Sequence, residues 1–143
     1  MIPRIVGVVL VVTAVAVAVH TVVEPLYYAS TEEAPYSPFW SVLDVLMAVT
    51  IAIALAFAYL RKRAAAGEGG SALTRGYLVA NTLFYGLLFV GIMFYWNWFN
   101  LLSPSYTAVP EAAVSLAWII IDAGLPLLLG ALGVSLLRGT RDR

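Results

Sequence analysis

Residues 38–60 read PFWSVLDVLMAVTIAIALAFAYL, and Asp44 is the only charged side chain among them. A helix needs about 20 predominantly apolar residues to cross the hydrocarbon core of a bilayer. This run is long enough, and Pro38 suits the first turn of a helix because that position needs no N–H. We therefore predict a transmembrane helix that carries one carboxylate near its start.

Three more apolar runs of membrane-spanning length occur at 3–23, 75–98 and 110–137. A signal peptide is the alternative for 3–23, but the run is longer than a typical signal core and has no clean small-residue cleavage site. The chain is 62% hydrophobic and only 11% charged, whereas a soluble domain is about a quarter charged. We predict an all-α fold, in which residues 1–143 form a single transmembrane domain, a four-helix bundle.

The basic residues set the expected orientation of this bundle. All eight fall on the same side of the four-helix plan: Arg4, Arg61, Lys62, Arg63, Arg75, Arg138, Arg141 and Arg143. The loops 24–37 and 99–109 contain none. Because Lys and Arg gather in cytoplasmic loops, both termini and the link 61–74 are expected in the cytoplasm. We expect a multi-pass protein of a prokaryotic cytoplasmic (inner) membrane, with the two other loops outside.

A short pattern occurs twice, as Trp40-Ser-Val-Leu-Asp44 and Trp118-Ile-Ile-Ile-Asp122. Each copy lies near the start of a helix that opens with proline and ends in Leu-Arg. This similarity predicts two tandem helical-hairpin repeats in parallel orientation, related by an axis along the membrane normal. Coincidence between two apolar hairpins of similar composition is the alternative.

Composition excludes several kinds of chemistry. The chain has no cysteine, so it has no disulfide and no thiolate metal site. Its single histidine excludes a haem held by two imidazoles of one subunit. The few basic residues are explained by topology, so nucleic acid is not an expected partner. No nucleophile–base set or phosphate-binding loop occurs, so an enzyme is not indicated.

The two aspartates are the main candidates for a functional site. An ionised aspartate costs at least a few kcal/mol in the bilayer, so neither Asp44 nor Asp122 should face lipid. Four-residue steps from Asp44 pass through Ala48, Ala52 and Ala56, which predicts a small-residue ridge with Ala52 at a helix–helix contact. The pair is either a polar cluster that ties helices together or a site for a cation or proton.

Other polar and aromatic residues are expected at the same depth, where they would form a polar chamber that opens outward. Its predicted members are His20, Glu24, Asp44, Trp96, Asn97, Asn100, Trp118 and Asp122. A metal is a weaker hypothesis, with His20, Glu24, Asp44 and Asp122 as its ligands, because their spacing matches no known metal motif. The cluster Tyr95, Trp96, Trp98 and Phe99 predicts an aromatic belt at the outer interface, and stacking of an apolar ligand is the alternative. The sequence identifies no cofactor.

Three functions are compatible with these features. The first is a non-catalytic subunit or interaction protein of a larger membrane complex, with the lipid bilayer and other membrane subunits or further copies as partners. The second is a small oligomeric transporter or channel, coupled to cations or protons through Asp44 and Asp122. The third is a membrane-embedded enzyme or redox component with a metal or lipid-like ligand in the outer chamber.

Overall fold

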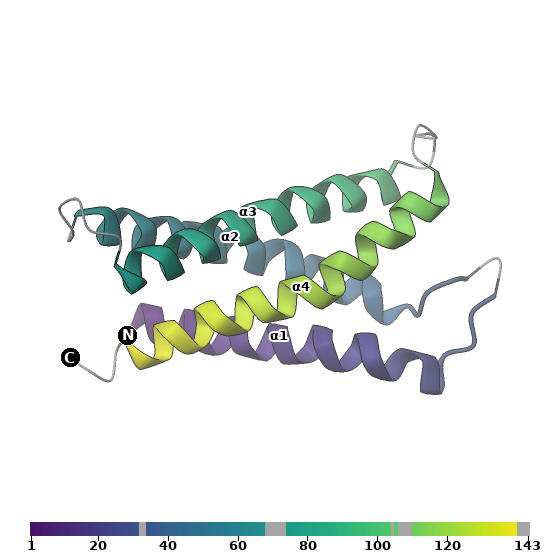
Figure 1. The fold of residues 1–143 in the computed structure, drawn as a ribbon. Helices are drawn as coiled ribbons and strands as arrows, with labels where there is room; N and C mark the ends of the chain where they lie inside the picture. Colours follow the sequence, from purple (N-terminus) through teal and green to yellow (C-terminus); the bar gives the residue numbers. More distant parts are fainter. Residues whose placement is uncertain (32–33, 68–73, 104, 106–109, 140–143) are drawn as a thin grey trace.

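The computed structural model of the chain describes residues 1–31, 34–67, 74–103, 105 and 110–139. These residues form four helices, α1 (Ile2–Tyr27), α2 (Phe39–Gly67), α3 (Arg75–Leu101) and α4 (Glu111–Arg138), which are shown in Figure 1. No strand occurs in the described ranges. Each helix is long and apolar enough to cross a membrane. The predicted all-α fold with four helices of membrane-spanning length is confirmed.

Two of the helices extend well beyond their predicted ends. α1 continues past residue 23 through Glu24 and Pro25 to Tyr27. A proline in the last turn removes only the hydrogen bond to the carbonyl of Thr21, so the helix survives it. α2 continues through its basic residues to Gly67, since Arg, Lys and Ala are strong helix formers. A run of basic residues therefore does not by itself end a helix.

Consecutive helices run in opposite directions, so the start of α1, the end of α2, the start of α3 and the end of α4 lie at the same end of the bundle (Figure 1). We call this the basic end, because it holds the described basic residues Arg4, Arg61, Lys62, Arg63, Arg75 and Arg138. The opposite part of the bundle, the acidic end, holds the described carboxylates Glu24, Asp44, Glu111 and Asp122. α1 packs mainly against α4, and α2 mainly against α3.

α1 and α4 approach each other closely near the basic end, at Gly7 and Gly133. A Cβ atom added to Gly133 would lie 2.8 Å from the carbonyl oxygen of Gly7 and 2.8 Å from a methyl group of Val11. The reverse substitution at Gly7 would place a Cβ 2.9 Å from the carbonyl oxygen of Gly133. The two backbones therefore approach at a distance that only glycine permits, as in other small-residue helix contacts in membranes.

The outside of the bundle is apolar, as contact with lipid requires. On α1, Val8, Val12, Val15, Val19 and Val22 are each about half exposed or more. In water such a face would be a large unsatisfied apolar patch. The exposed valines therefore agree with the hydropathy of the helices in assigning them to the bilayer.

The predicted small-residue ridge on α2 is wrong beyond its first step. Ala48 is buried, but Ala52 and Ala56 are exposed on the outside of the bundle. The buried alanines are instead Ala54, at 0% exposure, and Ala58, at 1%. Four-residue steps advance about 40° beyond a full turn each time, so a row that begins inside the bundle soon points away from it.

Candidate functional site

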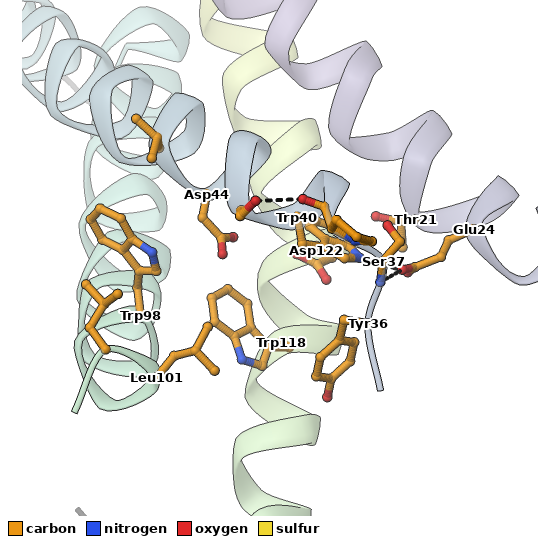
Figure 2. Close-up of a pocket in the computed structure, with 14 residues that line it drawn as sticks. Thr21, Glu24, Tyr36, Ser37, Trp40, Asp44, Trp98, Leu101, Trp118 and Asp122 are labelled. Carbon is orange, nitrogen blue, oxygen red and sulfur yellow. Dashed lines mark hydrogen bonds between the residues drawn. The ribbon is translucent and has the colours of Figure 1, made fainter. Parts of the chain in front are cut away.

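A cavity of about 440 Å³ lies at the acidic end, between all four helices. We call it the acidic cavity, and Figure 2 shows its lining side chains. The lining residues are Thr21, Glu24, Tyr36, Ser37, Pro38, Trp40, Ser41, Asp44, Val45, Trp98, Leu101, Leu102, Trp118 and Asp122. Three of them are carboxylates, four are aromatic, and none is Lys, Arg or His. The cavity is therefore acidic in charge and largely aromatic in its walls.

Both copies of the repeated pattern contribute to this cavity. Residues four apart lie on the same face of a helix, so Trp40 and Asp44 line it together from α2. Trp118 and Asp122 line it in the same way from α4. The four-residue spacing within each copy therefore places a tryptophan and a carboxylate side by side in the lining of the acidic cavity.

Glu24 has a structural task within this site. One of its carboxylate oxygens accepts a hydrogen bond from the backbone N–H of Ser37 at 2.8 Å, and the other accepts one from Nε1 of Trp40, also at 2.8 Å. Glu24 thus ties α1 to the end of the following connection and fixes the indole of Trp40. Both of its oxygens already have a partner, so it is less available to a ligand than the two aspartates.

Asp44 and Asp122 are not compensated in this way. Asp44 is only 5% exposed, and in Figure 2 its carboxyl group points into the space bounded by Trp98 and Trp118. In the described part of the chain no hydrogen bond or salt bridge to its side chain occurs. Oδ1 of Asp122 is buried without a hydrogen-bond partner, and Asp122 lines the same cavity as Asp44 and Glu24.

Uncompensated carboxylates of this kind are costly. Burial of an unpaired charge costs several kcal/mol, which a protein avoids by protonation or by pairing the charge with a cation.

Two prolines increase the number of acceptors near the cavity. Pro25 and Pro126 lie inside helices and have no N–H, so the carbonyls of Thr21 and Asp122 lack their usual helical donor. In Figure 1 α4, which contains Pro126, curves along its length.

Four of the eight residues predicted for the outer chamber line the acidic cavity, and these are Glu24, Asp44, Trp118 and Asp122. His20 lies outside it. Its Nδ1 is 3.0 Å from the hydroxyl of Tyr27 and its Nε2 is 3.3 Å from the hydroxyl of Ser37. Its ring packs edge-on against Trp40, with 4.6 Å between ring centroids. His20 therefore supports one wall of the cavity from behind.

The other three predicted residues also lie away from the cavity lining. Trp96 is 45% exposed on the outside of α3, where it fits the predicted aromatic belt. Asn97 is fully buried; its Nδ2 donates to the carbonyl of Met93, while its Oδ1 has no partner. Asn100 is half-buried, and its Nδ2 is also without a partner. Within the described ranges, no group of three His, Asp or Glu side chains is arranged to hold a metal ion.

Sequence reasoning missed several walls of the cavity, above all Tyr36, Trp98 and Leu101. The sequence predicts Tyr36 in a loop and Trp98 in the aromatic belt at the outer interface. Trp98 instead stacks on Phe94, with 5.8 Å between ring centroids and 28° between ring planes. Trp118 meets the same Phe94 edge-on at 5.9 Å. Only the packing of α3 against α4 brings Trp98 and Trp118 together, and no local pattern reveals it.

Comparison of the chain with models of protein families, with characterised proteins and with solved structures finds no match. The site is therefore interpreted from its own chemistry. Its elements are a cavity between helices of membrane-spanning length, two carboxylates without partners, one buried and one half-buried, and a set of fixed aromatic rings.

Proposed function

We propose that this protein binds a cation in the acidic cavity, with Asp44 and Asp122 as the counter-charges, and that it acts in cation-coupled transport across the membrane. The observation that carries this proposal is a pair of unpartnered carboxylates, the buried Asp44 and the half-buried Asp122 with its buried Oδ1, which line one cavity without a basic side chain. Ionisable groups inside a membrane bundle are costly and commonly mark the path of an ion or a substrate. A bound cation would relieve that cost directly.

The proposed orientation places the acidic cavity on the outer side of the membrane and the basic end in the cytoplasm. The described basic residues support it, because all of them lie at the end opposite the cavity. An outward-facing acidic cavity would attract cations from outside the cell. Because four helices enclose little space, we propose that transport requires an oligomer, and that the two parallel hairpins each supply one Trp–Asp pair to the site.

Intrinsic fluorescence can test this function. Three of the four tryptophans line the acidic cavity, so occupancy should change their emission. Purified protein in lipid nanodiscs would be titrated with the chlorides of K⁺, Mg²⁺ and tetraethylammonium, in its wild-type form and as Asp44→Asn. At least one cation should change the emission of the wild type, and Asp44→Asn should weaken that response.

A matched control comes from the same end of the bundle. Glu111 is exposed and does not line the cavity, so Glu111→Gln should respond to cations as the wild type does. Thermal unfolding of each variant in detergent shows that it is folded. If no cation gives a response that depends on Asp44, the proposed function is wrong.

A second proposal is that the chain is a non-catalytic subunit of a larger membrane complex. The exposed alanines Ala52 and Ala56 favour it, since small residues on an outer helix face permit close approach of another helix. Purification from the native membrane in a mild detergent tests this proposal. Stable co-purification of another membrane protein, lost in Ala52→Leu, would support it, and isolation of this chain alone would count against it.

A further inference from the structure

The walls of the acidic cavity identify the class of cation that fits it. We infer that the ligand is an organic cation, an amine or quaternary ammonium whose apolar substituents contact Trp40, Trp98 and Trp118. This inference rests on the proposed function and adds the chemical nature of the ligand. The faces of aromatic rings attract cations, and tryptophan does so most strongly.

The size of the cavity argues against a small inorganic ion as its ligand. A volume of about 440 Å³ lies within the range of pockets for organic ligands, about 300–1,000 Å³. Ca²⁺ and Mg²⁺ need six or more oxygen ligands at roughly 2.0–2.6 Å, and no described group of three acidic or histidine side chains is arranged for that. The carboxylates come from three different helices and border the space without converging on one point.

The indole rings are held in place before any ligand arrives. Trp40 donates its Nε1 hydrogen to Glu24 and is backed by the ring of His20. Trp98 and Trp118 both rest on Phe94, which is fully buried. Fixed walls reduce the ordering that binding would otherwise require, so the rings favour a ligand that fills the existing shape.

Charge and shape are recognised by different groups in this arrangement. Asp44 and Asp122 supply the negative charge, and the tryptophan faces supply contact with the apolar substituents. Val45, Leu101 and Leu102 add aliphatic side chains to the lining. A neutral molecule of the same shape would leave both carboxylates uncompensated, whereas a bare ion would leave most of the apolar wall without contact.

The test compares three probes on the wild-type protein in lipid nanodiscs by isothermal titration calorimetry. Tetraethylammonium is the organic cation, K⁺ is the inorganic cation, and 3,3-diethylpentane is the neutral carbon analogue of the first. We expect tetraethylammonium to bind more tightly than either of the others. This comparison needs no mutation, so it does not depend on the folding of a variant.

Four variants then assign the binding to the cavity. Trp98→Leu should weaken tetraethylammonium binding roughly 2- to 30-fold, the loss of one cation–π contact, and Trp98→Phe should weaken it less. Trp96→Leu is the matched control, because Trp96 lies two residues away and outside the cavity, and it should leave the affinity unchanged. Asp44→Asn should weaken binding about 30-fold or more, as expected for a desolvated charge pair.

The outcomes separate the inference from the proposed function. If K⁺ or Mg²⁺ binds with dependence on Asp44 and tetraethylammonium does not, the organic cation is wrong and cation binding stands. If 3,3-diethylpentane binds as tightly as tetraethylammonium, or if Trp98→Leu has no effect, the inference is overturned. If no cation binds in a manner that depends on Asp44, both the inference and the proposed function fail.

Discussion

Gly133→Ala should destabilise the bundle, because the added methyl group falls on backbone. The Cβ would lie 2.8 Å from the carbonyl oxygen of Gly7, whereas ordinary contacts begin at 3.4 Å. The helices α1 and α4 would have to separate by 3.4 − 2.8 = 0.6 Å at this point. The carbonyl cannot rotate away as a flexible side chain could, and overpacking of this kind costs about 1–3 kcal/mol.

Gly133→Ala also stabilises the helix through its higher helix propensity, and a control variant measures that gain separately. Alanine is about 1 kcal/mol better than glycine in a helix interior, so Gly133→Ala combines a gain with a loss. Gly124 lies on the same helix, and a Cβ there would meet only a methyl group of Val90, at an ordinary 3.7 Å. Gly124→Ala should therefore show the gain alone. The difference between the two variants should equal the cost of overpacking, about 1–3 kcal/mol.

The measurement is thermal unfolding in detergent, followed by circular dichroism on both variants and the wild type. For a chain of this length 1 kcal/mol corresponds to roughly 2–4 °C in Tm. Gly133→Ala should thus unfold several degrees below Gly124→Ala. Equal Tm values for the two variants would refute the close α1–α4 contact at Gly133.

Three more predictions address the packing of α2, the anchoring of the cavity and the orientation in the membrane. Ala54→Leu should lower the free energy of unfolding by about 1–3 kcal/mol, because it overpacks a fully buried position. Ala52→Leu, on the exposed face, should be nearly neutral in detergent. Equal costs for the two variants would contradict the observation that Ala54 faces the bundle interior and Ala52 faces outward. Glu24→Ala should cost about 1–3 kcal/mol, because it leaves two donors without their acceptor, and Glu24→Gln should cost less since it keeps one oxygen; thermal unfolding measures both, and a neutral Glu24→Ala would show that the carboxylate is not an anchor. On intact cells, a membrane-impermeant thiol reagent should label Ser105→Cys and not Gly67→Cys in this cysteine-free chain, and the reverse pattern would invert the topology.

The number and position of the helices could be predicted from hydropathy, because membrane crossing requires long apolar runs and nothing else in the chain competes with them. The ends of the helices were less predictable. α1 runs past Pro25 and α2 runs past Arg63, since neither residue type stops a helix by itself when the neighbouring residues favour one.

Half of the candidate site could also be predicted, for a reason that lies in helix geometry. The four-residue interval from Trp40 to Asp44 fixes which residues share a face over a single turn. Repeated over about two turns, the same interval drifts around the helix, which is why Ala52 faces outward. The contribution of Trp98 depends on how α3 packs against α4, and the position of Tyr36 depends on the path of a connection that Glu24 anchors. Neither is encoded in a local spacing.

The close contact of α1 and α4 at Gly7 and Gly133, which we call the glycine crossing, has a mechanical consequence for the acidic cavity at the other end of the bundle. Gly7 and Glu24 are 17 residues apart on one helix, which corresponds to a lever arm of about 25 Å. A rotation of α1 by roughly 5° about the crossing would move the Glu24 end by about 2 Å, by the geometry of a rigid helix of that length. A tilt of that size would therefore displace Glu24, which is part of the cavity lining, by more than the radius of a water molecule.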